Sequence, residues 1–209
     1  IVNISRSGPG LGGISPSQGD YFQATRGGGH GDYRMIVLAP STVQEMYDLT
    51  CLAFDLADKY RNPAMILGDA LIGQMKEPLI RRKTDKMELP PKDWALTGAQ
   101  GRKPNRLKSL YLQEGELSEH NWKLHQKYER MKKEEVRFES FRVEDAQLVV
   151  AAFGSMARVS KTSVELAREE GMKVGLVRPI TLFPFPEEAL DKLSKRVKTF
   201  LTVELNTGQ

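Results

Sequence analysis

The sequence predicts an α/β protein of two parallel-sheet units joined by a long irregular connector. Near both ends of the 209-residue chain, short apolar runs alternate with segments of helical period, and a stretch rich in Pro, Gly and charge separates them. Parallel strands need a crossover of a dozen or more residues, usually a helix, so this alternation indicates parallel sheets. We expect a first unit over residues 1–77, a connector with one surface helix over 78–143, and a second unit over 144–209.

The first unit reads as strand, helix and strand after a short opening strand at residues 1–4. Residues 35–40 are an unbroken apolar run ended by proline, which is typical of a buried parallel strand. Ser41 is the expected N-cap of a helix, with Gln44 completing a capping box. Apolar residues then recur at helical spacing until Asn62-Pro63 ends the helix, and residues 64–68 form the next buried strand.

The connector has two parts. Proline and glycine interrupt every candidate element over residues 78–115, whereas 117–136 is charged and helix-prone, with a narrow apolar stripe. We interpret the second part as a surface helix lying against the body or a partner. Much of the basic excess falls between Arg81 and Arg106, which we attribute to a solvated loop rather than to a patch that binds nucleic acid.

The second unit repeats the alternation as strand, helix, strand, helix and strand. The expected strands cover residues 148–153, 173–178 and 199–205, and the expected helices cover 156–170 and 187–196. Gly171 closes the first of these helices and Pro179 ends the strand that follows it. The chain starts inside one strand and stops just after another, so we expect a piece of a longer polypeptide.

Composition limits the class of protein. The net charge is +4, and no apolar run approaches the roughly 18 residues of a membrane span. The single cysteine, Cys51, excludes an internal disulfide and an iron–sulfur cluster held by this chain alone. It also points to a reducing compartment, so we expect a cytoplasmic protein. The lack of a long apolar run and the position of the basic residues in a loop predict no membrane or nucleic-acid partner. Inside its helix, Cys51 is expected to be a small packed residue.

A glycine-rich turn, SRSGPGLGG, follows the opening strand. Gly8, Gly10 and Gly13 formally match G-x-G-x-x-G, but no helix begins inside the motif as a dinucleotide site requires. Pro9 also removes one of the amides that such a site would use. Two interpretations of Arg6 remain: a guanidinium aimed at a carboxylate or phosphate, or a structural salt bridge at a strand end.

A second glycine cluster, TRGGGHGDYR, contains His30. This side chain could contact a substrate or carry a proton, or it could be a structural residue in a tight turn. The residue types alone leave both interpretations open.

The segments NISRSGPGLGGISPSQGDYFQATRGGGHGDYRMIVLAPS and GSMARVSKTSVELAREEGMKVGLVRPITLFPFP carry a family resemblance that covers essentially the whole chain. The sequence resembles the α subunit of 2-oxoacid:ferredoxin oxidoreductases, most closely the 2-oxoisovalerate (branched-chain) branch. The resemblance implies that residues 1–77 are the C-terminal part of a thiamine-diphosphate pyrimidine-binding domain. Residues 144–209 would then be a truncated transketolase C-terminal-like domain.

The resemblance also implies an activity: oxidative decarboxylation of a 2-oxoacid to acyl-CoA, with electrons passed to ferredoxin. Thiamine diphosphate and Mg²⁺ would be bound mainly by the β subunit, iron–sulfur clusters would sit on other subunits, and coenzyme A would be the co-substrate. The chain alone is expected to be inactive. The alternative is a noncatalytic module, in which 81–106 and the helix at 117–136 dock a partner subunit.

Residue by residue, the resemblance places Arg6 on the substrate carboxylate, with Gly8, Pro9 and Gly10 shaping the turn beside it. We also assign His30 to substrate binding, and we expect no catalytic residue or metal ligand in this chain. Gly68-Asp69-Ala70 is not the diphosphate- and Mg²⁺-binding signature of the family, which is Gly-Asp-Gly followed by an Asn. Gly154-Ser155 could offer amides to a coenzyme A phosphate or could simply form a tight strand-to-helix turn.

Overall fold

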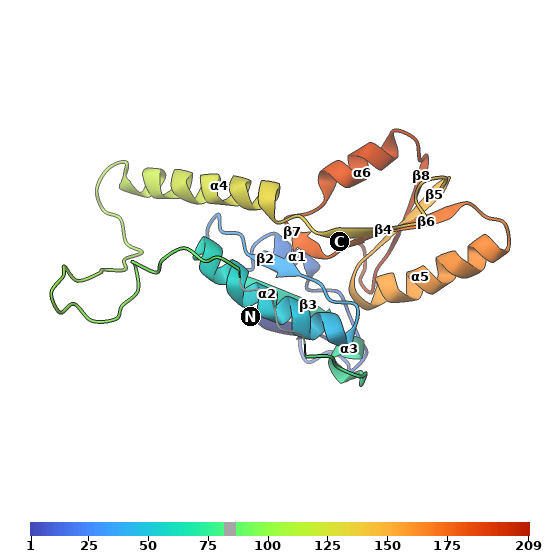
Figure 1. The fold of residues 1–209 in the computed structure, drawn as a ribbon, viewed down its shortest axis with the longest axis horizontal. Coiled ribbons are helices and arrows are strands. Elements are labelled where there is room, and N and C mark those ends of the chain that lie inside the picture. Colours follow the sequence, from blue (N-terminus) through green and yellow to red (C-terminus); the bar gives the residue numbers. More distant parts are fainter. Residues whose placement is uncertain (82–86) are drawn as a thin grey trace.

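The computed structural model describes residues 1–81 and 87–209 and contains two four-stranded sheets with helices packed on their faces (Figure 1). The first sheet has the order β1-β3-β2-β7 and the second has the order β4-β6-β5-β8. Three strands in each sheet run parallel, and one edge strand in each runs antiparallel. The α/β class predicted from the sequence is confirmed.

The first sheet is built mainly from the N-terminal third of the chain. Its parallel strands are β1 (Val2–Ser5), β3 (Ala64–Asp69) and β2 (Ile36–Leu38). The long helix α2 (Val43–Tyr60) connects β2 to β3. Two short helices, α1 (Tyr21–Thr25) and α3 (Ala70–Gln74), lie beside these strands.

Both faces of this sheet are covered, which explains the unbroken apolar runs. Ile36 and Leu38 of β2 pack against α2, while Val37 between them faces the opposite layer, where Ala24 of α1 and Phe153 also pack. Successive side chains of a strand point to opposite faces, so a sheet buried on both sides needs apolar residues at every position.

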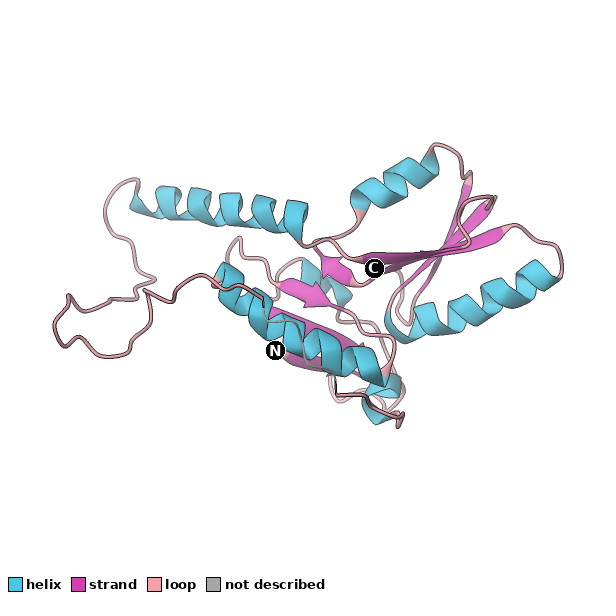
Figure 2. Ribbon diagram, in the orientation of Figure 1, coloured by secondary structure: helices cyan, strands magenta, loops and turns pink. Residues whose placement is uncertain are grey.

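The second sheet has the same layered construction (Figure 2). Its parallel strands are β6 (Val174–Pro179), β5 (Leu148–Ala152) and β8 (Thr199–Val203). Helix α5 (Gly154–Glu169) packs on one face through Ala157 and Val164, and helix α6 (Glu187–Ser194) packs on the other through Leu193.

Two antiparallel edge strands come from segments outside the strands expected from the sequence. β4 (Phe138–Phe141), in the predicted connector, pairs with β6, and β7 (Thr181–Phe183), in the predicted second unit, pairs with β2. Each has only three or four residues, too few for a clear period. Their pairing depends on partners far away in the sequence.

The N-terminus of α2 differs from its prediction by one residue. The N-cap is Thr42, whose hydroxyl accepts a hydrogen bond from the amide of Glu45 at 3.1 Å, whereas Ser41 was expected. Glu45, and not Gln44, reaches back to the Ser41 amide at 2.8 Å. Arg178 of β6 pairs with Glu45 at 2.7 Å, which draws the acidic side chain to this position and ties the second sheet to the first unit.

The described connector residues 87–115 extend away from the two sheets, and α4 (Glu116–Glu134) runs back toward them, with Tyr128 and Met131 in the core of the first unit (Figure 1). The described residues between α3 and α4 contain no helix or strand, as predicted. Part of the predicted basic stretch, including Arg82, Lys83 and Lys86, lies outside the described residues. Helix α4 buries only Tyr128 and Met131, while Trp122 is 64% exposed. None of the described helices has the length and apolar character needed to cross a bilayer.

Candidate substrate-binding site

The carboxyl ends of the parallel strands in the two sheets are joined by direct contacts. Arg6 follows β1 and Asp69 ends β3 in the first sheet, while Phe153 follows β5 in the second. Ser155, at the start of α5, donates a hydrogen bond to Asp69 at 2.5 Å across this junction. In open α/β sheets, ligands bind outside the carboxyl ends of the strands, so a binding site is expected at this junction.

The glycine-rich turn after β1 holds the guanidinium of Arg6 in place. The turn closes through the Gly13 amide, which donates to the Ser7 carbonyl at 2.8 Å. Nη1 of Arg6 donates to the carbonyl oxygens of Leu11 and Gly13 at 2.5 and 2.9 Å. Among the described residues no carboxylate pairs with Arg6, and its Nε and Nη2 have no hydrogen-bond partner. The positioned cation therefore keeps donors for an external anion.

A cavity of about 370 Å³ lies beside this guanidinium. Its lining comes from the turn after β1, from the loop before α1 and from the segment after β8: Arg6, Gly8, Pro9, Ser17, Gly19, Asp20, Asn206, Thr207 and Gln209. The structure thus brings Arg6, Gly8 and Pro9 of the predicted site to one cavity. Gly10, the fourth predicted residue of this turn, is not in the lining.

Gly12, which the sequence reasoning did not single out, has the strongest steric requirement in the turn. Its φ is +56°, and a Cβ there would fall 1.9 Å from the Ser7 carbonyl oxygen. Gly8 has open space around its Cβ position, and Gly10 requires glycine only through its φ of +67°. Only the folded path of the loop shows which glycine prevents a collision.

His30 lies at the opposite end of the parallel strands of the first sheet from Arg6. Its loop, residues 26–34, precedes β2, so it sits at the amino ends of the parallel strands, whereas Arg6 sits at their carboxyl ends. The His30 side chain is exposed and does not line the Arg6 cavity. The structure therefore does not bring His30 and Arg6 together in one site within this chain.

The turn at Gly154-Ser155 is packed against protein groups. Both residues are buried, and a Cβ on Gly154 would lie 3.1 Å from Nε2 of Gln18, at a φ of +58°. This packing favours the tight-turn interpretation over an anion site.

Asp69 is also committed to internal contacts. Besides accepting from Ser155, its carboxylate caps α3 through the amides of Leu71 and Ile72 at 2.9 and 3.2 Å. The described part of the chain contains no group of three or more His, Cys, Asp or Glu side chains that could hold a metal ion. The described residues therefore do not fit the diphosphate end of a thiamine cofactor with its metal.

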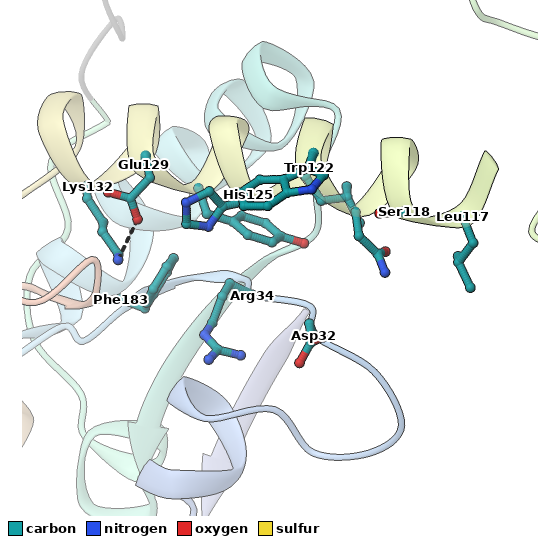
Figure 3. Close-up of a pocket in the computed structure, with 12 residues that line it drawn as sticks. Asp32, Arg34, Leu117, Ser118, Trp122, His125, Glu129, Lys132 and Phe183 are labelled. Atoms are coloured by element: carbon teal, nitrogen blue, oxygen red, sulfur yellow. Dashed lines mark hydrogen bonds and ion pairs between the residues drawn. The ribbon is translucent and has the colours of Figure 1, made fainter. Parts of the chain in front are cut away.

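A larger cavity, about 600 Å³ in volume, lies beneath α4 (Figure 3). Trp122 and His125 of the helix line it from one side, and Arg34 and Phe183 line it from the other. It shares no lining residue with the Arg6 cavity. The sequence reasoning did not anticipate it, because it forms only when α4 folds back over the strand ends.

Two family models match the sequence over consecutive ranges. Residues 1–140 match the model described as pyruvate flavodoxin/ferredoxin oxidoreductase, thiamine-diphosphate-binding. The chain belongs to this oxidoreductase family. Residues 146–209 match the model of pyruvate:ferredoxin oxidoreductase core domain II. The family resemblance recognised in the sequence is thereby confirmed.

Individual relatives agree with this family assignment. The chain is 51% identical over 209 residues to ketoisovalerate oxidoreductase subunit VorB of Methanothermobacter marburgensis. It is 36% identical over 216 aligned residues to 2-oxoglutarate synthase subunit KorA of Archaeoglobus fulgidus. The higher identity to the ketoisovalerate subunit agrees with the predicted branch. All of this chain is matched, but it spans only 59% and 61% of the lengths of these relatives.

A solved structure supports the fold of this oxidoreductase family member. The 2-oxoglutarate:ferredoxin oxidoreductase of Magnetococcus marinus, solved with 2-oxoglutarate, coenzyme A and succinyl-CoA bound, superposes with a TM-score of 0.78 at 24% sequence identity. The match covers 99% of this chain and 41% of that one. At this identity the similarity shows that the fold is shared.

Proposed function

We propose that this chain is part of the α subunit of a 2-oxoacid:ferredoxin oxidoreductase and that Arg6 binds the substrate carboxylate. The enzyme converts a 2-oxoacid and coenzyme A to acyl-CoA and CO₂ and passes the electrons to ferredoxin. One observation supports the role of Arg6 above all. Two backbone carbonyls hold its guanidinium beside a cavity at the carboxyl ends of the strands, and its remaining donors are free of protein partners among the described residues.

The chemistry of the turn suits this role. A guanidinium presents parallel N–H groups that match the two oxygens of a carboxylate, and it stays charged at every physiological pH. Because Nη1 is already anchored, little freedom remains to be lost when the substrate binds. The identity to ketoisovalerate oxidoreductase subunits favours 2-oxoisovalerate as the substrate.

We propose that other subunits supply what the described residues lack. A β subunit would hold most of the thiamine diphosphate and Mg²⁺, an iron–sulfur subunit would carry the clusters, and ferredoxin would accept the electrons in the cytoplasm. The relatives are themselves described as subunits, which supports assembly with other chains. The exposed Trp122 and Leu112 favour contacts of the connector and α4 with such a subunit. A purely noncatalytic interaction module is the alternative function.

The test uses the complete complex with the full-length subunit. Arg6→Lys retains the charge but loses the parallel N–H donors of the guanidinium, so the apparent KM for 2-oxoisovalerate should rise about tenfold or more. Arg6→Ala also removes the charge and should raise this KM further. Arg26→Lys is the matched control, because Arg26 stacks on Phe22 outside the cavity. Unchanged KM values in both Arg6 variants would reject the carboxylate site and favour the interaction module.

A further inference from the structure

Gln18 is a buried polar residue that the fold of the first sheet does not explain. It lies in the loop between β1 and α1 and is 3% exposed. Its side-chain amide bonds to the second unit at both ends. Nε2 donates to the carbonyl of Phe153 at 2.9 Å, and Oε1 accepts from the amide of Leu205 at 3.0 Å.

The backbone of Gln18 strengthens the same link. Its amide donates to the Leu205 carbonyl at 2.8 Å, and its carbonyl accepts from Nδ2 of Asn206 at 3.3 Å. Phe153 follows β5 and Leu205 follows β8, so one residue of the first unit joins the carboxyl ends of two strands of the second. A buried amide satisfied at both ends in this way has a strongly preferred position.

The hydrogen bonds between Gln18 and the second unit lie next to the Arg6 cavity. Ser17 and Gly19, on either side of Gln18, line the cavity. The opposite lining comes from Asn206, Thr207 and Gln209 of the second unit. Gln209 adds a contact of its own, because its Nε2 donates to the Gly19 carbonyl at 2.8 Å.

We propose that the turn at residues 206–209 is the second wall of the carboxylate site and that Gln18 is the positioning residue that holds it against the Arg6 turn. This inference rests on the proposed function of Arg6. The substrate therefore binds between two units, with the cation on one and a hydrogen-bonding turn on the other.

Within the second wall, Thr207 is the side chain available to a ligand. Oδ1 of Asn206 accepts from the amides of Gly208 and Gln209, and its Nδ2 donates to Glu204 and Gln18. The side chain of Gln209 is likewise used at both ends, by Gly19 and Phe22. The hydroxyl of Thr207 has no partner among the described residues, so it can donate to the same anion as Arg6.

The chemistry of the Gln18 link gives a specific test. Glutamate has the same shape and still accepts from the Leu205 amide, but its carboxylate has no proton for the Phe153 carbonyl. Gln18→Glu should therefore displace the second wall at neutral pH. At lower pH the protonated carboxyl can donate again, so the wall should return.

Steady-state kinetics of the complete complex, with the full-length subunit, measure the effect. Gln18→Ala and Gln18→Glu should raise KM for the 2-oxoacid about tenfold while changing kcat less, and the KM of Gln18→Glu should fall back as the pH is lowered. The control is Gln44→Ala, which removes an amide that ties α2 to Ile80 at 2.9 and 3.0 Å outside the cavity, and it should leave KM unchanged.

Thr207→Val provides a second, independent variant. Thr207 is exposed, so the complex should assemble normally, and loss of the hydroxyl should raise KM about fivefold.

Three outcomes are distinguishable. A rise in KM for Gln18, Thr207 and Arg6 variants supports the inference. A rise for Arg6→Lys alone rejects the second wall and leaves the proposed function standing. An unchanged KM in every variant rejects both the second wall and the proposed function of Arg6. If the Gln18 variants do not assemble into the complex, the KM of Thr207→Val decides whether residues 206–209 form the second wall.

Discussion

Nζ of Lys59, in the last turn of α2, lies 2.6 Å from Oε1 of Glu135, the residue that follows α4. Glu135 is 2% exposed and also accepts from the hydroxyl of Tyr60 at 2.7 Å and pairs with Arg137 at 2.9 Å. Two cations and one hydroxyl donor thus satisfy one buried carboxylate at the point where α4 joins the body. This cluster fixes the end of a helix that otherwise buries little.

Lys59→Met should destabilise the chain by about 2 kcal/mol, because it removes a charged hydrogen bond from a buried carboxylate while two donors remain. Lys192→Met is the matched control. Lys192 pairs with Glu188 at 3.9 Å with both side chains exposed, so its loss should cost less than about 0.5 kcal/mol. Urea unfolding of the two variants measures the difference. Equal losses would show that the Glu135 cluster contributes no more than a surface pair.

The same cluster should make stability depend on acid pH. Burial raises the pKa of Glu135, but hydrogen bonds from Lys59, Tyr60 and Arg137 outweigh it, so the pKa lies below its ordinary value of 4.5. Hydrogen bonds from Arg130, Tyr60 and Lys59, in decreasing order of effect, lower the pKa of Glu134 to about 2. The folded chain then binds fewer protons than the unfolded chain at acid pH.

The free energy of unfolding should therefore fall as the pH drops below 4.5 toward 2, where the lowered carboxyl groups become protonated. In Glu135→Gln, which has one such group fewer, stability is lower at neutral pH, and the difference from the unmodified chain should narrow as the pH falls. Urea unfolding between pH 3 and 7 tests this. Parallel curves for the two chains would exclude a contribution from Glu135.

Arg178 should couple the two units. It is 5% exposed, and two of its nitrogens contact the two carboxylate oxygens of Glu45 at 2.7 and 3.0 Å. Arg178→Lys loses this fork and should cost about 2 kcal/mol. Arg196→Lys, at an exposed arginine that bonds the Glu144 carbonyl, is the control and should be nearly neutral. Thermal unfolding of both variants distinguishes a coupling residue from an ordinary arginine.

The Arg6 turn should depend on Gly12 more than on Gly8. Gly12→Ala places a Cβ against the Ser7 carbonyl at a positive φ, so the loop must take another path. Gly8→Ala meets no neighbour and should leave thermal stability unchanged. Proteolysis of the loop should therefore be faster in Gly12→Ala only. Equal protease resistance in the two variants would contradict the described path of the turn.

The 209-residue chain alone should show no turnover. The described residues contain no cluster of three or more His, Cys, Asp or Glu side chains that could hold a metal ion, and Asp69 of Gly68-Asp69-Ala70 is committed to α3 and Ser155. Mixing the chain with thiamine diphosphate, Mg²⁺, 2-oxoisovalerate, coenzyme A and a viologen dye should give no reduction, whereas the complete complex should reduce the dye. Reduction at enzymatic rates by the chain alone would overturn the assignment of the cofactor to other subunits.

The strands β2 and β3 and the helix α2 could be recognised before the structure because their signals are local. An unbroken apolar run and a helical period lie within the segments that adopt them, and burial against any neighbour gives the same pattern. The family could be recognised for a similar reason, since long matched segments such as the Arg6 turn are read directly from consecutive residues.

Tertiary structure alone decided which distant segments meet. Gln18 and Leu205, which are hydrogen-bonded, are 187 positions apart, and β7 pairs with a strand from the first unit. His30 and Arg6 are only 24 positions apart, but they lie at opposite ends of the strands of one sheet. Residue type and spacing along the chain determine local conformation, since they govern backbone sterics and the period of burial. Contacts across the sheets depend on how whole layers pack, and no single segment carries that information.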